Sequence, residues 1–179
     1  MVGDERLRLF VALPLPDDTL DEIVAWQRRE LGGGGGRVVP RENLHVTVAF
    51  LGSRPAADVV GIVAALRSGA ADAPAPVLGA RGYRETRSVG MLVLSDEDER
   101  ATQLASRVAT ALERVGAYEP ERRPWLPHVT VLRFREPPRL VRAVPDLAPF
   151  SPSEVALYHS VLRPTGAQYV RRESVALGG

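Results

Sequence analysis

Short stretches in which apolar and polar side chains alternate are the most regular feature of this chain, and alternation with a period of two predicts β-strands with one buried face. Two such stretches, 43–51 and 125–134, are also rich in β-branched residues, which favour strands. A mostly apolar run from Leu7 to Leu13 predicts a more deeply buried strand. Further strands are predicted over residues 77–83, 88–94, 154–162 and 168–177, the last two joined by a turn at 163–166.

Three other stretches carry apolar residues at helical spacing. The first, 17–31, begins with two aspartates and ends near two arginines, and these charges suit the two ends of a helix dipole. Five consecutive glycines follow it and end the helix. Further helices are predicted over 56–68 and 99–115, the second of them strongly amphipathic. Strands and helices alternate twice without a linker between the halves, which predicts a single bilobed domain over residues 1–179.

Composition narrows the chemistry that such a domain can perform. The 179 residues are 45% hydrophobic and 25% charged, which is typical of a globular protein. Cysteine is absent and all 23 basic residues are arginine, which excludes disulfides, thiolate nucleophiles and lysine-based covalent catalysis. The net charge is only +1, although residues 121–142 hold six arginines and two acids. No stretch has the length of a membrane span and the first residues do not resemble a signal peptide, so we expect a cytoplasmic protein without a membrane partner.

A repeated motif is the clearest chemical signal. Two of the three histidines have a threonine two residues later, in His45-Val46-Thr47-Val48 and His128-Val129-Thr130-Val131. Residues i and i+2 of a strand point to the same face, so each motif sets an imidazole beside a hydroxyl and turns its valines toward the core. Two such strands on either side of a groove would gather both histidines and both threonines around one small site.

This set of side chains suits the chemistry of phosphate esters. Two imidazoles with pKa values near 6.5 can work at neutral pH as one base and one acid, as phosphoryl transfer to water requires when the attacking and leaving oxygens lie on opposite sides of phosphorus. The hydroxyls of Thr47 and Thr130 could donate hydrogen bonds to the non-bridging oxygens. Arg133 is expected near the end of the strand that begins at His128, where it could bind phosphate with two hydrogen bonds. Away from the motif, such an arginine would usually be a surface residue.

Other chemistries fit these residues less well. A zinc site needs three or four ligands, whereas each motif supplies one and only Glu42 is a nearby carboxylate. His159 could be a further ligand but lies in no comparable motif, and we expect an ordinary structural histidine there. No serine lies in a Gly-x-Ser-x-Gly turn, which disfavours a Ser–His–Asp triad. We therefore expect neither a metal nor another cofactor.

With its two His-x-Thr motifs, the chain resembles the 2H phosphoesterase superfamily, and within it the RNA 2′,3′-cyclic phosphodiesterases that are often labelled 2′-5′ RNA ligases. The matching stretches occur in the family's order and span nearly the whole chain: 8–12, 43–52, 127–133 and 160–169. The resemblance implies a bilobal, pseudo-twofold α+β fold in which two antiparallel β-sheets line a central groove and the helices lie outside. It also implies metal-independent hydrolysis of RNA 2′,3′-cyclic phosphate ends to 2′-phosphomonoesters, with ligation as the reversal of a phosphodiester cleavage.

The resemblance also implies roles for individual residues. Carried over by position, His45 would donate a proton to the departing O3′ and His128 would accept a proton from water. Thr47 and Thr130 would bind phosphate oxygens, and Arg133 matches the family's arginine near the phosphate.

Several questions stay open at this level. Phe50 is a candidate for stacking on a nucleobase, with a core aromatic as the alternative. The implied partner is an RNA with a 2′,3′-cyclic phosphate end, and we expect a monomer without an obligate protein partner. One alternative is an enzyme that acts on ADP-ribose 1″,2″-cyclic phosphate or a small cyclic nucleotide, and another is a module that binds RNA ends without turnover. The arginines of 121–142 favour a longer polyanion.

Overall fold

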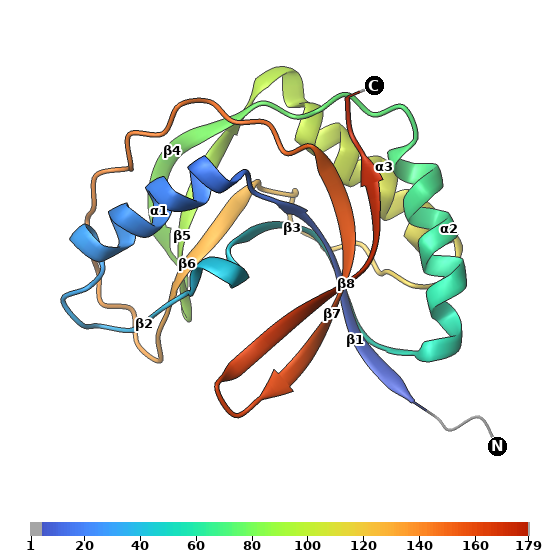
Figure 1. Ribbon diagram of the computed structural model, residues 1–179, viewed down its shortest axis with the longest axis horizontal. Helices are drawn as coiled ribbons and strands as arrows, with labels where there is room; N and C mark the ends of the chain where they lie inside the picture. The colour runs from blue at the N-terminus through green and yellow to red at the C-terminus, as the bar shows by residue number, and fades with distance from the viewer. Residues whose placement is uncertain (1–4, 179) are drawn as a thin grey trace.

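The computed structural model of the protein describes residues 5–178, and Figure 1 shows their path from the N-terminus in blue to the C-terminus in red. The helices are α1 (Asp17–Glu30), α2 (Val59–Ala70) and α3 (Arg100–Arg114), with 3₁₀ turns at Arg41–Asn43, Ala56–Asp58 and Glu97–Glu99. The strands are β1 (Arg6–Pro14), β2 (Arg37–Val38), β3 (His45–Pro55), β4 (Leu78–Glu85), β5 (Val89–Asp96), β6 (His128–Arg133), β7 (Glu154–Arg163) and β8 (Gly166–Ala176).

Within residues 5–178, these strands form one curled antiparallel sheet in the order β4-β5-β6-β3-β1-β7-β8, and β2 pairs with β6 (Figure 1). The sheet consists of two groups, β4-β5-β6 and β3-β1-β7-β8. In this part of the chain the groups meet at a single residue pair, Val46 opposite Val129. The predicted α+β fold with antiparallel strands and outer helices is confirmed, and the two sheets predicted are joined into one through the Val46–Val129 pair.

The three helices pack against both groups of strands. α1 follows β1 in sequence but packs on the other group, since the Trp26 ring lies 6.1 Å from the Tyr83 ring of β4. α2 and α3 lie side by side near β3, β7 and β8 (Figure 1). They approach closely at Gly69, where a Cβ atom would lie 2.8 Å from the Cα of Val108. One contiguous apolar core therefore draws on both groups of strands.

The apolar faces that the sequence predicts are buried as expected. All four valines of the two His-x-Thr motifs are at most 4% exposed, because they pack into this core. The predicted helices 17–31, 56–68 and 99–115 correspond to α1, α2 and α3 within a few residues, the second starting with the 3₁₀ turn at Ala56–Asp58. The ends of the two motif strands differ more.

Both motif strands begin at their histidine rather than two or three residues earlier. Before His45 the chain makes the 3₁₀ turn Arg41–Asn43, and before His128 it is extended but unpaired as a strand. Pro127 cannot donate a backbone hydrogen bond, which explains the late start of β6. The two-residue strand β2 was not predicted, because it follows the glycine run and is too short to show alternation.

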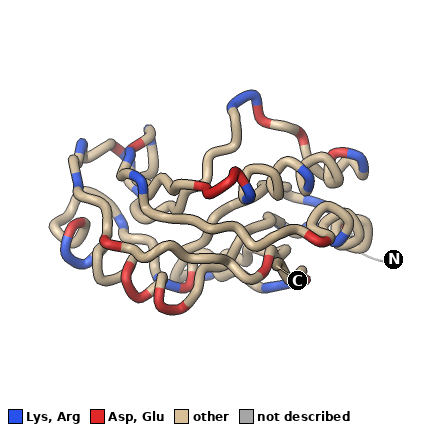
Figure 2. Tube along the Cα trace, turned by 90° about the horizontal axis from the view of Figure 1, so that it is seen from above, with Lys and Arg blue, Asp and Glu red and all other residues tan. Residues whose placement is uncertain are grey.

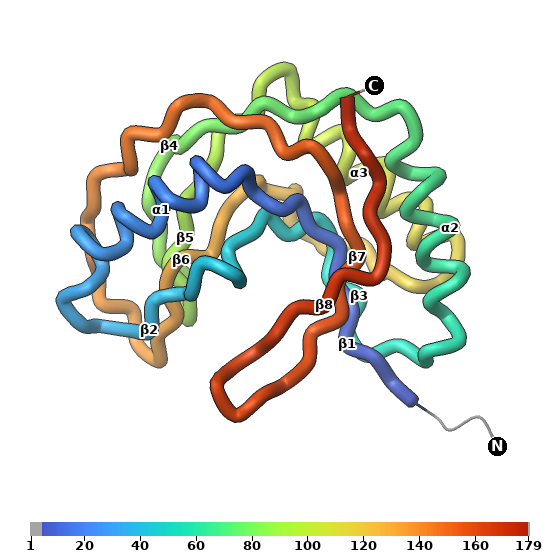
Figure 3. Tube along the Cα trace, viewed as in Figure 1, coloured from blue at the N-terminus to red at the C-terminus, as the bar shows by residue number. Residues whose placement is uncertain are grey.

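The segment between β6 and β7, residues 134–153, runs around the outside of β4 and α1 (Figure 3). Its hydrogen bonds to the rest of the protein include that from the Trp26 indole to the Ala143 carbonyl, at 2.7 Å, and the backbone pair that Phe150 makes with Leu78. Acidic and basic residues are interspersed along the whole trace (Figure 2). None of the helices between residues 5 and 178 is long and apolar enough to cross a membrane.

Candidate active site

The two His-x-Thr motifs meet where the two groups of strands join. Val46 lies opposite Val129, and each valine directly follows the histidine of its motif, so the pair sits on a local twofold axis. In this antiparallel register His45 lies beside Thr130, and directly opposed side chains have Cβ atoms about 5 Å apart. The structure therefore brings both histidines and both threonines to the sheet face opposite the buried valines.

Both imidazoles are oriented in the same way by the main chain. Nδ1 of His45 lies 2.8 Å from the Asn43 carbonyl oxygen, and Nδ1 of His128 lies 2.8 Å from the Leu126 carbonyl oxygen. A carbonyl oxygen can only accept, so Nδ1 carries the hydrogen in both rings. In the neutral ring Nε2 is consequently free to accept a proton, and in the protonated ring Nε2–H is the proton available for donation.

A β-bulge brings Arg133 to the same face as His128. An offset of five residues would put the two side chains on opposite faces of a regular strand. In β6, however, Thr130 lies opposite Met91 and Leu132 opposite Gly90, so Val131 is an extra residue. Val131 and Leu132 are both fully buried, and the alternation resumes with Arg133 on the groove side at the end of the strand.

The first motif has the same bulge at the equivalent position. Thr47 lies opposite Ala12 and Ala49 opposite Val11, which leaves Val48 as the extra residue of β3. Phe50, five residues after His45, is thereby returned to the groove side, and its side chain is 63% exposed. Phe50 is therefore the pseudosymmetric counterpart of Arg133, and it is not a core aromatic.

The surroundings of His45 keep its imidazole neutral. Burial lowers the pKa of His45 to about 4, against the opposing effect of the Asn43 carbonyl, and the positive charges of Arg133 and His128 lower the pKa further. These charges act on His45 because both groups lie close to it. The hydroxyl of Thr47 donates to Nε2 of His45 at 2.9 Å, which also favours the neutral ring.

Aromatic side chains gather around His45. The Phe10 ring centroid lies 5.1 Å from that of His45, and Tyr169 meets His45 edge-on at 5.4 Å. Tyr158 stacks on Phe10 at 5.3 Å. Beside this cluster is a pocket of about 150 Å³, lined by Phe10, Pro14, Leu15, Leu20, Arg41, Glu42, Leu44, His45, Tyr158 and Tyr169.

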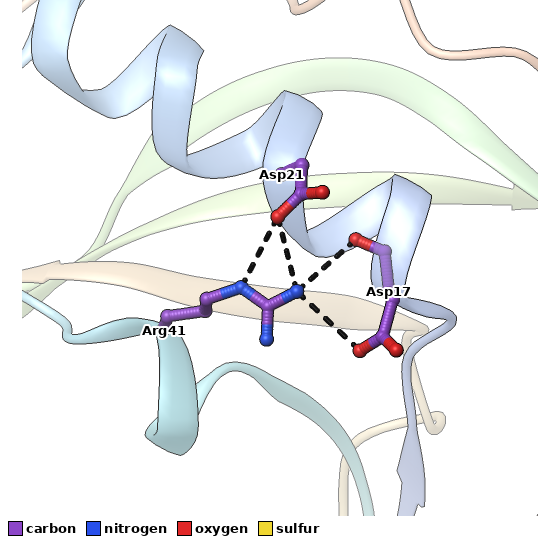
Figure 4. Close-up of polar contacts among 3 residues, drawn as sticks. All are labelled: Asp17, Asp21 and Arg41. Atoms are coloured by element: carbon purple, nitrogen blue, oxygen red, sulfur yellow. Dashed lines mark hydrogen bonds and ion pairs between the residues drawn. The ribbon is translucent and has the colours of Figure 1, made fainter.

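Arg41 at the rim of this pocket is held by the first turns of α1 (Figure 4). Its Nη2 lies 3.0 Å from a carboxylate oxygen of Asp21 and 3.4 Å from one of Asp17. All three side chains are exposed, so the ion pairs contribute little to stability. Their effect is to fix the direction of the guanidinium at the pocket rim.

The remaining candidates lie elsewhere. His159 follows Tyr158 directly on β7, so strand alternation sends its side chain to the opposite face. No group of three or more His, Asp or Glu side chains within residues 5–178 is placed to hold a metal ion. A larger hollow of about 240 Å³, between Ala57 and Ala117, contains none of the predicted site residues.

Sequence reasoning missed several residues that shape the site. Phe10 and Tyr169 reach His45 and Tyr158 stacks on Phe10, all from strands that are distant in sequence, and nothing in their local pattern separates them from core aromatics. Trp125 donates its indole N–H to the Thr47 carbonyl at 3.1 Å. Only its position three residues before a motif histidine could have drawn attention to it.

Comparisons with known proteins agree with this architecture. The 2′-5′ RNA ligase superfamily matches residues 15–163. The RNA 2′,3′-cyclic phosphodiesterase of Escherichia coli is 31% identical over 132 residues, which cover 72% of this chain and 73% of that protein. The RNA 2′,3′-cyclic phosphodiesterase of Thermus thermophilus is 28% identical over 181 residues, covering 97% of this chain and 91% of that protein. The crystal structure of E. coli LigT complexed with NADP+ has a TM-score of 0.84 at 27% identity and covers 98% of this chain and 99% of that one.

The curled antiparallel sheet, with one His-x-Thr strand on each side of a local twofold axis, and the family match define the class of protein as a 2H phosphoesterase. The chain belongs to the 2′-5′ RNA ligase superfamily and is an enzyme of the hydrolase class.

Proposed function

We propose that the protein hydrolyses the 2′,3′-cyclic phosphate at the end of an RNA to a 2′-phosphomonoester, using two histidines and no metal. The observation that carries this proposal is the local twofold pairing of the two motifs, in which each imidazole has its Nδ1 on a backbone carbonyl. Nε2 is then the nitrogen left for proton transfer in both rings, and in His45 it accepts a hydrogen bond from the Thr47 hydroxyl in the absence of substrate. The relatives named RNA 2′,3′-cyclic phosphodiesterase support the choice of substrate.

In the proposed reaction, water attacks phosphorus on the side opposite O3′. Nε2 of His128 accepts a proton from this water as the new P–O bond forms. The P–O3′ bond breaks, and Nε2–H of protonated His45 donates its proton to O3′, which leaves as a hydroxyl. The P–O2′ bond is kept, so the product is a 2′-phosphomonoester, and proton exchange with solvent returns both rings to their starting states.

The proposed donor must gain a proton before this step. His45 has a pKa of about 4 in the free protein, but a bound phosphate diester carries a negative charge that offsets the charges of Arg133 and His128. The phosphate oxygens also compete for the Thr47 hydroxyl, which otherwise stabilises the neutral ring. Substrate binding thus raises the pKa of His45 toward the range in which it can act as an acid.

Phosphate and nucleoside would be held by different parts of the groove. Arg133, Thr47 and Thr130 supply a guanidinium and two hydroxyls for the non-bridging oxygens, whose charge must be stabilised through the transition state. Phe50, which is 63% exposed, and the partly exposed rings of Tyr158 and Tyr169 supply flat surfaces on which a nucleobase can stack.

The test is an assay with an oligoribonucleotide that ends in a 2′,3′-cyclic phosphate, in the presence of EDTA. We expect conversion to the 2′-phosphate, and a loss of about 10³-fold or more in rate for His45→Ala and for His128→Ala. His159→Ala is the matched control and should retain the wild-type rate.

Three outcomes would contradict the proposal. Abolition by EDTA would point to a metal-dependent reaction, and tight binding of the oligonucleotide without turnover would point to a binding module. A kcat/KM that is higher for a nucleoside 2′,3′-cyclic monophosphate or for ADP-ribose 1″,2″-cyclic phosphate than for the oligonucleotide would favour a small-molecule enzyme.

A further inference from the structure

The join between the two motif strands is narrow. β1 pairs with β3 over its whole length and β5 pairs with β6 from Val89 to Val93, whereas within residues 5–178 β3 and β6 share only the Val46–Val129 pair. Pro127 precedes His128 and carries no N–H with which to continue the ladder. The spacing between the two imidazoles therefore depends on very few backbone hydrogen bonds.

A side chain supplies the next connection across this join. The indole N–H of Trp125 donates to the backbone carbonyl of Thr47 at 3.1 Å, and its half-buried ring packs on the apolar core. Trp125 lies three residues before His128, and Thr47 lies two residues after His45. A single hydrogen bond thus links the two segments that carry the imidazoles.

The acceptor of this bond belongs to the site itself. The hydroxyl of Thr47 donates to Nε2 of His45, so a displacement of the Thr47 peptide also moves this hydroxyl relative to the ring. Removal of the indole N–H would leave the Thr47 carbonyl without the donor that faces it across the join. The strands could then separate slightly or admit water between them.

We propose that Trp125 is a positioning residue that sets the distance between His45 and His128 for the two proton transfers, an inference that rests on the proposed function. A displacement of 1 Å in a catalytic group can cost about 10²-fold in rate, whereas one hydrogen bond makes only a small net contribution to stability. Loss of the Trp125 bond should therefore affect kcat far more than it affects folding.

The chain offers a matched control. Trp26 also donates its indole N–H to a distant backbone carbonyl, that of Ala143, at 2.7 Å, and this carbonyl belongs to neither motif. Trp125→Phe and Trp26→Phe therefore each remove one indole N–H and keep an aromatic ring. Only the first substitution touches the join between β3 and β6.

The experiment compares kcat, KM and thermal unfolding of the wild type and both variants on the cyclic-phosphate oligonucleotide. For Trp125→Phe we expect kcat to fall about tenfold to a hundredfold with little change in KM, and for Trp26→Phe we expect kcat to stay within about twofold.

Equal losses in both variants, or a wild-type kcat in Trp125→Phe, would overturn the assignment. If Trp125→Phe does not fold, incorporation of β-(benzothien-3-yl)alanine at position 125 removes the N–H and keeps the bicyclic ring, with the same expected result. An inactive wild type would instead refute the proposed function, and so the two failures are distinguishable.

Discussion

The two halves of the site have the same backbone and different neighbours. Each has a histidine at the start of a strand, Nδ1 on the carbonyl of the residue two positions earlier, a threonine two residues later and a bulge after the threonine. Around His45, aromatic rings pack against the imidazole, and the Thr47 hydroxyl donates to its Nε2. The strand that begins at His128 ends at the exposed Arg133. The main chain thus fixes the tautomer of both rings, whereas burial and the neighbouring side chains lower the pKa of His45.

The largest expected effect is on the rates of the two histidine variants, and it identifies which histidine is the acid and which is the base. A substrate whose 3′ oxygen is replaced by sulfur has a leaving group that needs no proton. We expect His45→Ala to lose about 10³-fold in rate on the oxygen substrate and to regain most of that loss on the 3′-thio substrate. His128→Ala should be slow on both. The measurement is kcat for each variant on each substrate, and rescue of His128→Ala instead would reverse the proposed roles.

The next effect concerns stability and pH. The pKa of His45 is lowered to about 4 in the folded protein, whereas the unfolded chain has the ordinary value near 6.5, so between these values the unfolded state binds more protons. The contribution of His45 to stability is fully present above pH 6.5 and is lost as the pH falls to 4, by about 3 kcal/mol in total.

Urea unfolding between about pH 4 and pH 7 measures this dependence. The slope of the unfolding free energy with pH should be shallower in His45→Gln than in the wild type, and unchanged in His159→Gln. A titration of the His45 ring by NMR that gives the ordinary pKa of about 6.5 in the free protein would contradict the prediction.

The equivalent positions Arg133 and Phe50 should differ in the kinetic constant they control. Arg133→Gln removes a charged hydrogen-bond donor from the phosphate, and we expect kcat/KM to fall about tenfold to a hundredfold. Phe50→Ala removes a stacking surface, and we expect KM to rise about tenfold with kcat nearly unchanged. If Arg133→Gln and Phe50→Ala both raise KM and leave kcat unchanged, the assignment of phosphate to Arg133 and of the nucleoside to Phe50 is contradicted.

The smallest effect distinguishes the two threonines. Thr47→Val removes the donor to Nε2 of His45 and should raise the pKa of that ring, whereas Thr130→Val should leave it nearly unchanged. Each substitution should lower kcat/KM by no more than about tenfold. NMR titration of the histidine rings checks the first expectation, and equal pKa changes in both variants would contradict it.

Much of this architecture follows from local pattern. Strand alternation predicts β3 and β6 and the burial of their valines, and the repeated motif predicts which two strands must meet. The bulges at Val48 and Val131 could not be predicted. A bulge places two adjacent apolar side chains on one face, and in a run of β-branched residues this looks the same as a strand that is buried on both faces.

Other parts of the site depend on contacts that no local pattern encodes. The distance from Trp125 to Thr47 is set by the meeting of strands that lie far apart in sequence. The same is true of Tyr169, which reaches His45 from the β7–β8 hairpin. Asn43 appears in sequence as the start of a strand, whereas its carbonyl in fact orients His45 from the end of a 3₁₀ turn.

The hydrogen bonds from Nδ1 of His45 and of His128 have a consequence for which substitutions preserve the orientation of the two rings. Their acceptors are the peptide oxygens of Asn43 and Leu126, and every amino acid provides such an oxygen. A substitution at either position changes the side chain but keeps the peptide oxygen, so the orientation of each ring depends on the path of the main chain and not on the identity of the side chain at that position. A point mutation at position 43 or 126 therefore leaves the acceptor of the Nδ1 hydrogen bond in place.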